Sequence, residues 1–404
     1  MSRVLCFVVL VCALSVAQVP QSFFAMSNVS ITDMPKVPYG TLGHPGVLGW
    51  TAIEGTARGT YNFSQIDAYV TRAPQVNGVA QIDLTLGYTP GWAVASQSSC
   101  KKLSSGTIAC TAPPDNIQDW TDFITLLINH YNGVSAPHIA LYEIWNEANL
   151  TTFWTGTVSQ LAALGAAAYP ILKSDPNSRV LTPSVVWEGA TGPSFTESYL
   201  ALAPADGVTF HAYTCKTLKI SGKCSMPEST KITQSTNAPL QTMITAFQAI
   251  GQPVYVTEGG WGLLGVTDPD LQEAWIAHYF IVGASYGLML QNWFEWGVPT
   301  KALSGNIEQS NGQTTGAGLA YGVVNGWLQG QTASACSGSS TIWSCPVGNN
   351  VIVWNSSQTC ANGVCTTKPY AVVGFSSYTD LTGTKRSVTN GSIALWIKPV
   401  LLQP

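Results

Sequence analysis

Residues 139–149 read IALYEIWNEAN, and residues 254–261 read VYVTEGGW. Each stretch is rich in β-branched and aromatic residues, which is typical of a buried strand. In each, a glutamate stands where the run gives way to a loop: Glu147 in the first and Glu258 in the second. The two stretches therefore predict two buried strands, each with a carboxylate at its carboxyl end.

Six further strand-like segments accompany these two. The eight together span residues 23–31, 37–44, 79–87, 139–146, 179–186, 207–213, 254–258 and 287–295. Helical patterns lie between them, at 63–72, 117–131, 158–173, 195–202, 240–250 and 270–286, with a closing helix at 316–328. Repeated alternation of strand and helix predicts an α/β fold, a (β/α)8 TIM barrel over residues 18–329. The alternative is a doubly wound open sheet, but its usual glycine-rich phosphate loop after the first strand is missing.

The sequence pattern of the chain changes after residue 329. Residues 330–404 show short strand-like runs separated by Ser, Gly, Asn and Pro turns. This part is too short and too β-rich to continue a barrel, so it predicts a small C-terminal β-sandwich accessory domain. No long linker precedes it, and we expect it to share an interface with the barrel.

Composition narrows the classes of ligand. The chain has 404 residues, of which 46% are apolar and only 9% are charged, and its net charge is −4. Such a surface offers no electrostatic footprint for nucleic acid or acidic membranes. A neutral ligand such as a polysaccharide fits it better, and we expect no cofactor and no metal.

The N-terminus has the pattern of a secretory signal peptide over residues 1–17. Arg3 precedes an apolar run, and Ser15-Val16-Ala17 forms a small-x-small cleavage site before Gln18. The run is too short for a membrane-spanning helix. We therefore expect a secreted protein, extracellular or periplasmic, that acts as a monomer and does not associate with membranes once the signal is removed.

The cysteine pattern agrees with export. Ten cysteines occur, and two of them lie in the predicted signal. An even number at close spacing in an exported chain predicts disulfides that staple loops. Proximity suggests the pairs Cys100 with Cys110, Cys215 with Cys224, Cys336 with Cys345, and Cys360 with Cys365.

The two glutamates suit one reaction in particular. On the strand count above, Glu147 follows strand four and Glu258 ends strand seven, so a barrel would place them across one mouth. Hydrolysis of a glycosidic bond requires such a pair. Two carboxylates in a partly dry site do not both stay charged, and Glu147, beside Trp145, is the better candidate to keep a proton. Taken singly, each has a simpler explanation, Glu147 as an acid near a helix N-cap and Glu258 as a loop acid.

The chain resembles the clan A glycoside hydrolases, and most closely family 39 and its relatives. The supporting strings are LTLGYTPGWA at 84–93, YEIWNEAN at 142–149, FHAY at 210–213, VYVTEGGW at 254–261 and the tail NGSIALWIKPVLL. The resemblance implies Glu147 as general acid/base and Glu258 as nucleophile. It also implies that Asn146 binds the sugar 2-hydroxyl. His211 and Tyr213 would line the −1 subsite, which holds the sugar whose bond is cleaved, with Tyr213 donating a hydrogen bond to Glu258.

Two features of the sequence bear on how the site would hold its substrate. Relatives usually carry an arginine near the end of strand two, whereas this stretch reads TLGHPGVLGW, so His44 is the candidate substitute. Among the tryptophans at predicted strand ends, Trp92 and Trp296 are the favoured stacking platforms for a sugar ring, although packing in the core is an equally good reading for either.

These observations predict a secreted retaining glycoside hydrolase. It would cleave β-glycosidic bonds of a plant or microbial polysaccharide or oligosaccharide by double displacement. The alternative is a catalytically weak or inactive carbohydrate-binding barrel protein, which the missing arginine allows. Retention of both glutamates argues against that alternative.

Overall fold

The computed structural model describes residues 17–28, 30–43, 49–75, 81–103, 105–214, 226–228, 238–261, 266, 268–297, 305–309, 311–338, 341–361 and 364–404. Eight parallel strands in this part form one sheet. They are β1 (Phe24–Asn28), β2 (Thr41–Gly43), β3 (Gln81–Thr85), β7 (Leu141–Glu143), β8 (Arg179–Leu181), β9 (Val208–Tyr213), β10 (Val254–Gly260) and β11 (Leu290–Trp296). Each lies within or overlaps one of the eight predicted segments.

The sheet curls into a nearly closed barrel. Its strand order is β8-β7-β3-β2-β1-β11-β10-β9, and every neighbouring pair is parallel. Two isolated parallel bridges, Leu181 to Gly207 and Val186 to His211, join the remaining edges at β8 and β9. The (β/α)8 barrel predicted from the sequence is thus confirmed.

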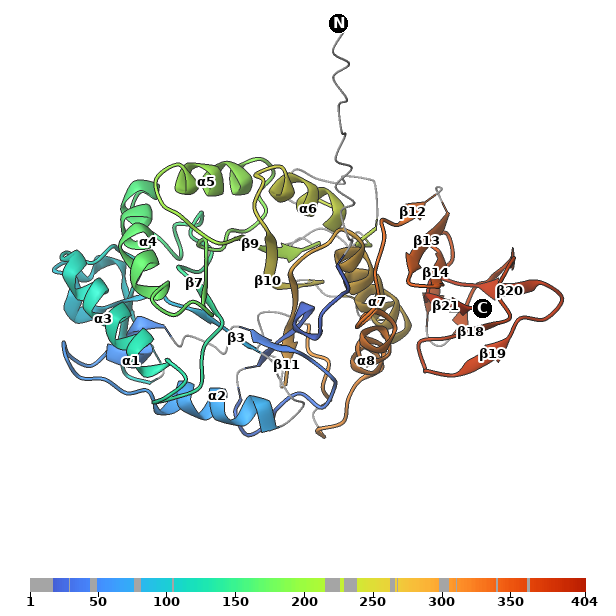
Figure 1. Cartoon of the computed structure of the whole chain (residues 1–404), viewed down its shortest axis with the longest axis horizontal. Coiled ribbons are helices and arrows are strands. Elements are labelled where there is room, and N and C mark those ends of the chain that lie inside the picture. The colour runs from blue at the N-terminus through green and yellow to red at the C-terminus, as the bar shows by residue number, and fades with distance from the viewer. Residues whose placement is uncertain are drawn as a thin grey trace, which may run out of the picture.

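Helices surround this barrel in Figure 1. They are α1 (Trp50–Glu54), α2 (Ser64–Gln75), α3 (Ile117–His130), α4 (Val158–Leu172), α5 (Thr191–Leu200), α6 (Leu240–Gln248), α7 (Pro269–Ser285) and α8 (Gly316–Leu328). Local sequence explains several of their starts. Thr157 and Gln160 form a capping box at α4, and the Asp268 side chain accepts the Leu271 N–H at α7.

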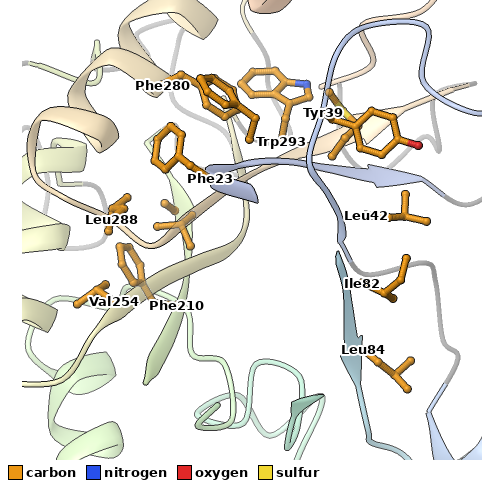
Figure 2. Packing of buried hydrophobic residues seen from close by; sticks show 14 of the residues in the cluster. Phe23, Tyr39, Leu42, Ile82, Leu84, Phe210, Val254, Phe280, Leu288 and Trp293 are labelled. Atoms are coloured by element: carbon orange, nitrogen blue, oxygen red, sulfur yellow. The ribbon is translucent and has the colours of Figure 1, made fainter. Parts of the chain in front are cut away.

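The core has two layers. A large cluster lies between strands and helices, and Figure 2 shows part of it, with Phe23 near Phe280 and with Leu42, Ile82 and Leu84 along β2 and β3. A small cluster from five different strands fills the barrel interior, consisting of Ala25, Leu141, Leu181, Tyr255 and Leu290. Because side chains alternate along a strand, residues two positions further on also point inward and form the next layer towards the carboxyl ends.

Two features of the barrel were not expected from the sequence. The five-residue helix α1 follows β2, and a three-stranded antiparallel sheet follows β3. This sheet contains β4 (Thr89–Pro90), β5 (Cys100–Lys102) and β6 (Ile108–Cys110), in the order β4-β6-β5. Such short strands carry too few residues to show an alternating pattern.

Beyond α8 the chain forms antiparallel sheets, which Figure 1 shows beside α7 and α8. Six strands have the order β12-β13-β14-β21-β18-β19: β12 (Ser337–Gly338), β13 (Ile342–Val347), β14 (Asn350–Asn355), β21 (Val400–Gln403), β18 (Ser377–Thr379) and β19 (Lys385–Ser387). β17 (Lys368–Ala371) pairs with β20 (Ser392–Leu395), and β15 (Cys360–Ala361) with β16 (Val364–Cys365). Val353, Leu395 and Leu402 share one apolar cluster, so the first two sheets pack face to face.

A buried polar cluster joins these sheets to the barrel. His278 on α7 places Nδ1 2.9 Å from Oε2 of Glu228 and Nε2 2.9 Å from the carbonyl oxygen of Ile397. The indole Nε1 of Trp354 donates to the second oxygen of Glu228 at 3.1 Å, and its ring stacks on His278. Four residues far apart in the sequence are thereby held together, as an interface without a linker requires.

Two of the four predicted disulfides are confirmed, Cys100–Cys110 and Cys336–Cys345. Cys365 is also disulfide-bonded. In the backbone ladder of β15 and β16 it lies directly opposite Cys360. Cys215 and Cys224 lie outside the described residues, so that pairing stays a prediction. Across the described helices, none combines the length and apolar character needed to cross a membrane.

Candidate active site

The two glutamates come together at the carboxyl end of the barrel. Glu258 lies near the end of β10, where the register with β9 shifts between Val256 and Glu258, so that Thr257 is the extra residue. Such a bulge changes the direction of the side chain that follows. After the shift, Glu258 lies directly opposite His211 in the ladder.

Glu147 stands four residues beyond β7, in a loop tied to the end of β8. Its backbone has a φ of 42°, which is uncommon for a residue other than glycine. The Glu147 N–H donates to Oγ of Ser184 at 3.0 Å, and the side chain of Asn149 both donates to and accepts from the backbone of Val186. These bonds hold the unusual backbone in place and fix the direction of the Glu147 side chain.

His211 bridges the two carboxylates. Its Nδ1 lies 2.8 Å from Oε1 of Glu147 and 3.7 Å from Oε2 of Glu258. One atom from each of the three side chains can be chosen so that all lie within 4.8 Å of one another. In retaining glycosidases the two carboxyl groups are about 5–5.5 Å apart, against about 6.5–9.5 Å in inverting enzymes. The close spacing fits the first class.

The charge on His211 explains how two carboxylates can lie so close. Burial alone would lower the pKa of this imidazole, but the charge of Glu258, the hydrogen bond to Glu147 and the charges of Glu147 and Glu143 raise it to about 9. At neutral pH the ring is therefore an imidazolium that offsets carboxylate repulsion. An imidazole binds a metal only through a deprotonated nitrogen, so a metal ion at this cluster would have to displace the proton from Nδ1.

The imidazolium also bears on the missing arginine. Within the described residues, the ion pairs formed by Glu147 and Glu258 are both with His211. His211, at the end of strand six, thus supplies a positive charge beside the two carboxylates of a chain that has no arginine near the end of strand two. The other candidate, His44, lies outside the described residues, and its predicted role stays a prediction.

Tyr213 and Asn146 lie beside the pair. The Tyr213 hydroxyl donates a short hydrogen bond to Oε1 of Glu258, as the resemblance implied. The Oδ1 atom of Asn146 is buried without a hydrogen-bond partner among the described residues, so it is available to a ligand hydroxyl. Both positions agree with the binding roles implied for them, which remain proposals.

Tyr88 is a site residue that the sequence did not single out. The pKa of its hydroxyl is raised, mainly by burial and then by the nearby charges of Glu147 and Glu258. A hydrogen bond with Asn146 partly opposes this shift. The ring packs edge-on against Trp145 at 5.9 Å. Its place just after strand three was the available signal, but several other aromatic residues shared that signal.

The two tryptophans expected as sugar platforms are placed differently. Trp296 is completely buried, so its ring offers no exposed face in this structure, and the expectation is corrected. Trp92 is half-buried: its Nε1 donates to the carbonyl of Glu54, and the Arg58 guanidinium lies 5.3 Å from its ring centroid. Large rings near a barrel rim remove more apolar surface from water by packing inward, which the sequence does not reveal.

A (β/α)8 barrel with two closely spaced carboxylates at the carboxyl ends of its strands is an arrangement that glycoside hydrolases use. The model of the family described as glycosyl hydrolases family 39 matches residues 51–282, more than half of the chain. The chain belongs to this family, and the resemblance seen in the sequence is confirmed.

Individual relatives are more distant. A β-xylosidase from Geobacillus stearothermophilus is 28% identical over 180 residues, which cover 42% of this chain and about a third, 34%, of the relative. A monomeric β-xylosidase from Caulobacter crescentus has a TM-score of 0.63 at 14% identity, covering 96% of this chain and 97% of that one. A family 39 enzyme from Xanthomonas axonopodis pv. citri has a TM-score of 0.63 at 15% identity, covering 96% of each chain. At these identities, the two structures support the fold alone.

Proposed function

We propose that the protein is a retaining glycoside hydrolase that cleaves β-glycosidic bonds by double displacement. The observation that carries this proposal is the short gap between Glu147 and Glu258, bridged by the imidazolium of His211. In the first step the Glu258 carboxylate attacks the anomeric carbon and the bond to the departing oxygen breaks, while Glu147, which receives a proton from the His211 imidazolium across their 2.8 Å hydrogen bond, passes it to that oxygen. In the second step Glu147 takes a proton from a water molecule whose oxygen attacks the anomeric carbon, which breaks the bond to Glu258 and releases the sugar with its configuration retained.

The neighbouring side chains support these roles. Tyr213 donates to Glu258 and thereby fixes the direction of the attacking carboxylate. The Oδ1 atom of Asn146, which has no hydrogen-bond partner among the described residues, would accept a hydrogen bond from the 2-hydroxyl of the sugar. His211 keeps the charge of the resting site low, so that a neutral sugar can enter without facing two uncompensated anions.

A β-xyloside is the first substrate to test, because two relatives carry the name β-xylosidase. The assay compares aryl β-xylosides, other aryl β-glycosides and plant or microbial polysaccharides. We expect Glu258→Ala to abolish turnover and Glu147→Ala to slow substrates with poor leaving groups most, since good leaving groups need no acid. Glu197→Gln, an exposed glutamate on α5, is the matched control and should leave turnover unchanged.

The stereochemistry of the product tests the mechanism itself. NMR of the first product formed should show the same anomer as the substrate. An inverted product would contradict double displacement. The alternative function, carbohydrate binding without turnover, would give no product with the wild type, and Glu258→Gln would then leave ligand affinity unchanged.

We further propose that the chain is exported, with residues 1–17 as a cleaved signal, residues 18–329 as the catalytic barrel and residues 330–404 as an accessory domain. The signal pattern and the disulfides support export. Expression with residues 1–17 and recovery from the culture medium, followed by N-terminal sequencing, tests this. We also propose that the protein is a monomer, which its mass in solution would check.

A further inference from the structure

A layer of polar side chains lies inside the barrel, beneath the carboxylate pair. The apolar interior cluster includes Leu141 on β7 and Tyr255 on β10. The polar layer begins two residues further along each of these strands. Glu143 and Thr257 therefore point into the barrel. Glu143 is completely buried, as is Asp83 on the adjacent strand β3. Buried carboxyl groups need hydrogen bonds to be tolerated.

Glu143 accepts hydrogen bonds from three hydroxyl groups. Thr85 donates to its Oε1 at 3.2 Å and Thr257 to its Oε2 at 2.6 Å, and Ser184 also bonds its carboxyl group. Burial raises the pKa of Glu143 above its ordinary value, whereas the charge of His211 and the hydroxyl groups of Thr257, Ser184 and Thr85 lower it. Burial, followed by the charge of Glu143, raises the pKa of Asp83 well above its usual range, while the charge of His211 lowers it, so of the two carboxyl groups Asp83 keeps its proton more firmly.

Two of these hydroxyl groups also belong to the chain segments that hold the catalytic pair. The Ser184 hydroxyl shares its single hydrogen between Glu143 and the carbonyl oxygen of Trp145, which lies 3.4 Å from Oγ, and its oxygen accepts the N–H of Glu147 at 3.0 Å. Thr257 is the bulge residue immediately before Glu258. Glu143 is thus linked to the strand that carries Glu258 by one hydrogen bond, through Thr257, and to the backbone of Glu147 by two hydrogen bonds, through Ser184.

Glu143 also acts on His211 through its charge. Three carboxylates act on this imidazole through their charges: Glu258 from β10, Glu147 from the loop after β7, and Glu143 from β7 itself. The imidazolium in turn lowers the pKa of Asp83 on β3. Glu143 is the only one of the first three that a substrate would not contact in the proposed mechanism. Its contribution therefore persists through the reaction.

We propose that Glu143 is a positioning residue for the proposed glycoside hydrolysis, holding both catalytic glutamates through Ser184 and Thr257 and stabilising the charge on His211 from inside the barrel. This inference rests on the proposed function. It differs from a purely structural role, because a buried acid that only filled space would affect neither the catalytic rate nor the titration of His211.

The test uses Glu143→Gln, which keeps the shape of the side chain and removes its charge. We expect kcat to fall roughly 10- to 100-fold with little change in KM, since misplaced catalytic groups lose rate rather than binding. The alkaline limb of the kcat pH profile should move to lower pH. Glu143→Asp retains the charge but is shorter, so it should restore the alkaline limb without restoring the rate.

A measurement that does not depend on activity separates this inference from the proposed function. The chain has five histidines, so the His211 imidazole can be followed by NMR after assignment with His211→Gln. Its titration midpoint should move to lower pH in Glu143→Gln. A wild type without glycosidase activity would overturn the proposed function, while an unmoved midpoint together with an unmoved alkaline limb would overturn the role of Glu143.

Two further variants guard the experiment against trivial loss of folding. Glu228→Gln makes the same chemical change at an equally buried glutamate in the cluster beneath the C-terminal sheets, and should lower Tm without moving the His211 midpoint. Thr257→Val keeps Glu143 and its charge but removes one hydrogen bond to it. It should lower kcat and leave the midpoint in place, and a full wild-type rate would contradict the positioning role.

Discussion

His211 and Glu258 lie directly opposite each other in the β9–β10 ladder, with Nδ1 of the first 3.7 Å from Oε2 of the second. The same Nδ1 is 2.8 Å from Oε1 of Glu147. The ladder bulge at Thr257 sets this opposition, because without it the alternation of β10 would turn the Glu258 side chain to the other face. The position of one extra residue thus determines whether the two glutamates share a cation.

The stability of the protein should depend on pH through His211. Folding raises the pKa of this residue from 6.5 to about 9, so its stabilising contribution is complete below about pH 6.5 and is lost as pH rises through about 9. The size of the contribution is on the order of 3 kcal/mol. Chemical denaturation between pH 6 and 10 should show the wild type losing more free energy of unfolding than His211→Gln, and parallel curves would refute the assignment.

Tyr213→Phe should slow the reaction without unfolding the protein. The change removes the hydroxyl that donates to Oε1 of Glu258, and a hydrogen bond to a charged group contributes about 1.5–3 kcal/mol. We therefore expect kcat/KM to fall roughly 10- to 100-fold. Tyr169→Phe is a matched control, because its hydroxyl donates to the carboxylate of Asp206, away from the site. Equal losses in both variants would show that the effect is not local to Glu258.

The contact between His278 and Glu228 should stabilise the junction of the barrel with the C-terminal sheets. A carbonyl oxygen only accepts, so Nε2 of His278 must donate to Ile397, and the bond between Nδ1 and Glu228 then needs a second proton. Breaking a buried pair of this kind costs about 3–5 kcal/mol. Calorimetry of His278→Gln should show a lower Tm, while kcat at 25 °C stays near that of the wild type; an unchanged Tm would count against the pair.

Removing the Cys100–Cys110 disulfide should affect both stability and substrate binding. The two cysteines are cross-strand partners, and Cys110 also pairs with Thr89, the residue after Tyr88. We expect the double alanine variant to lose roughly 2–3 kcal/mol of unfolding free energy, as for a short closed loop, and to have a raised KM. The Cys336–Cys345 variant has a similar sequence separation of 9 residues and should lose stability alone. A KM raised equally in both would argue against a local effect.

Much of the fold could be predicted from local patterns. The strands at 254–258 and 207–213 and the helix at 316–328 coincide closely with β10, β9 and α8, because each is a long enough run to show its period. The sheet β4-β6-β5 could not be predicted, since its strands have two or three residues each. The candidate catalytic glutamates were found from their place at strand ends, whereas the buried position of Trp296 was not.

The sequence by itself determined the barrel, the positions of Glu147 and Glu258 at the ends of strands four and seven, and two confirmed disulfides, because periodicity, strand order and close spacing are local properties of the chain. Only the tertiary structure decided that His211 lies between the two glutamates and that Glu143 accepts hydrogen bonds from Thr85 and Thr257 inside the barrel. Those relationships depend on burial and on contacts between strands that are far apart along the chain, and no local pattern contains them.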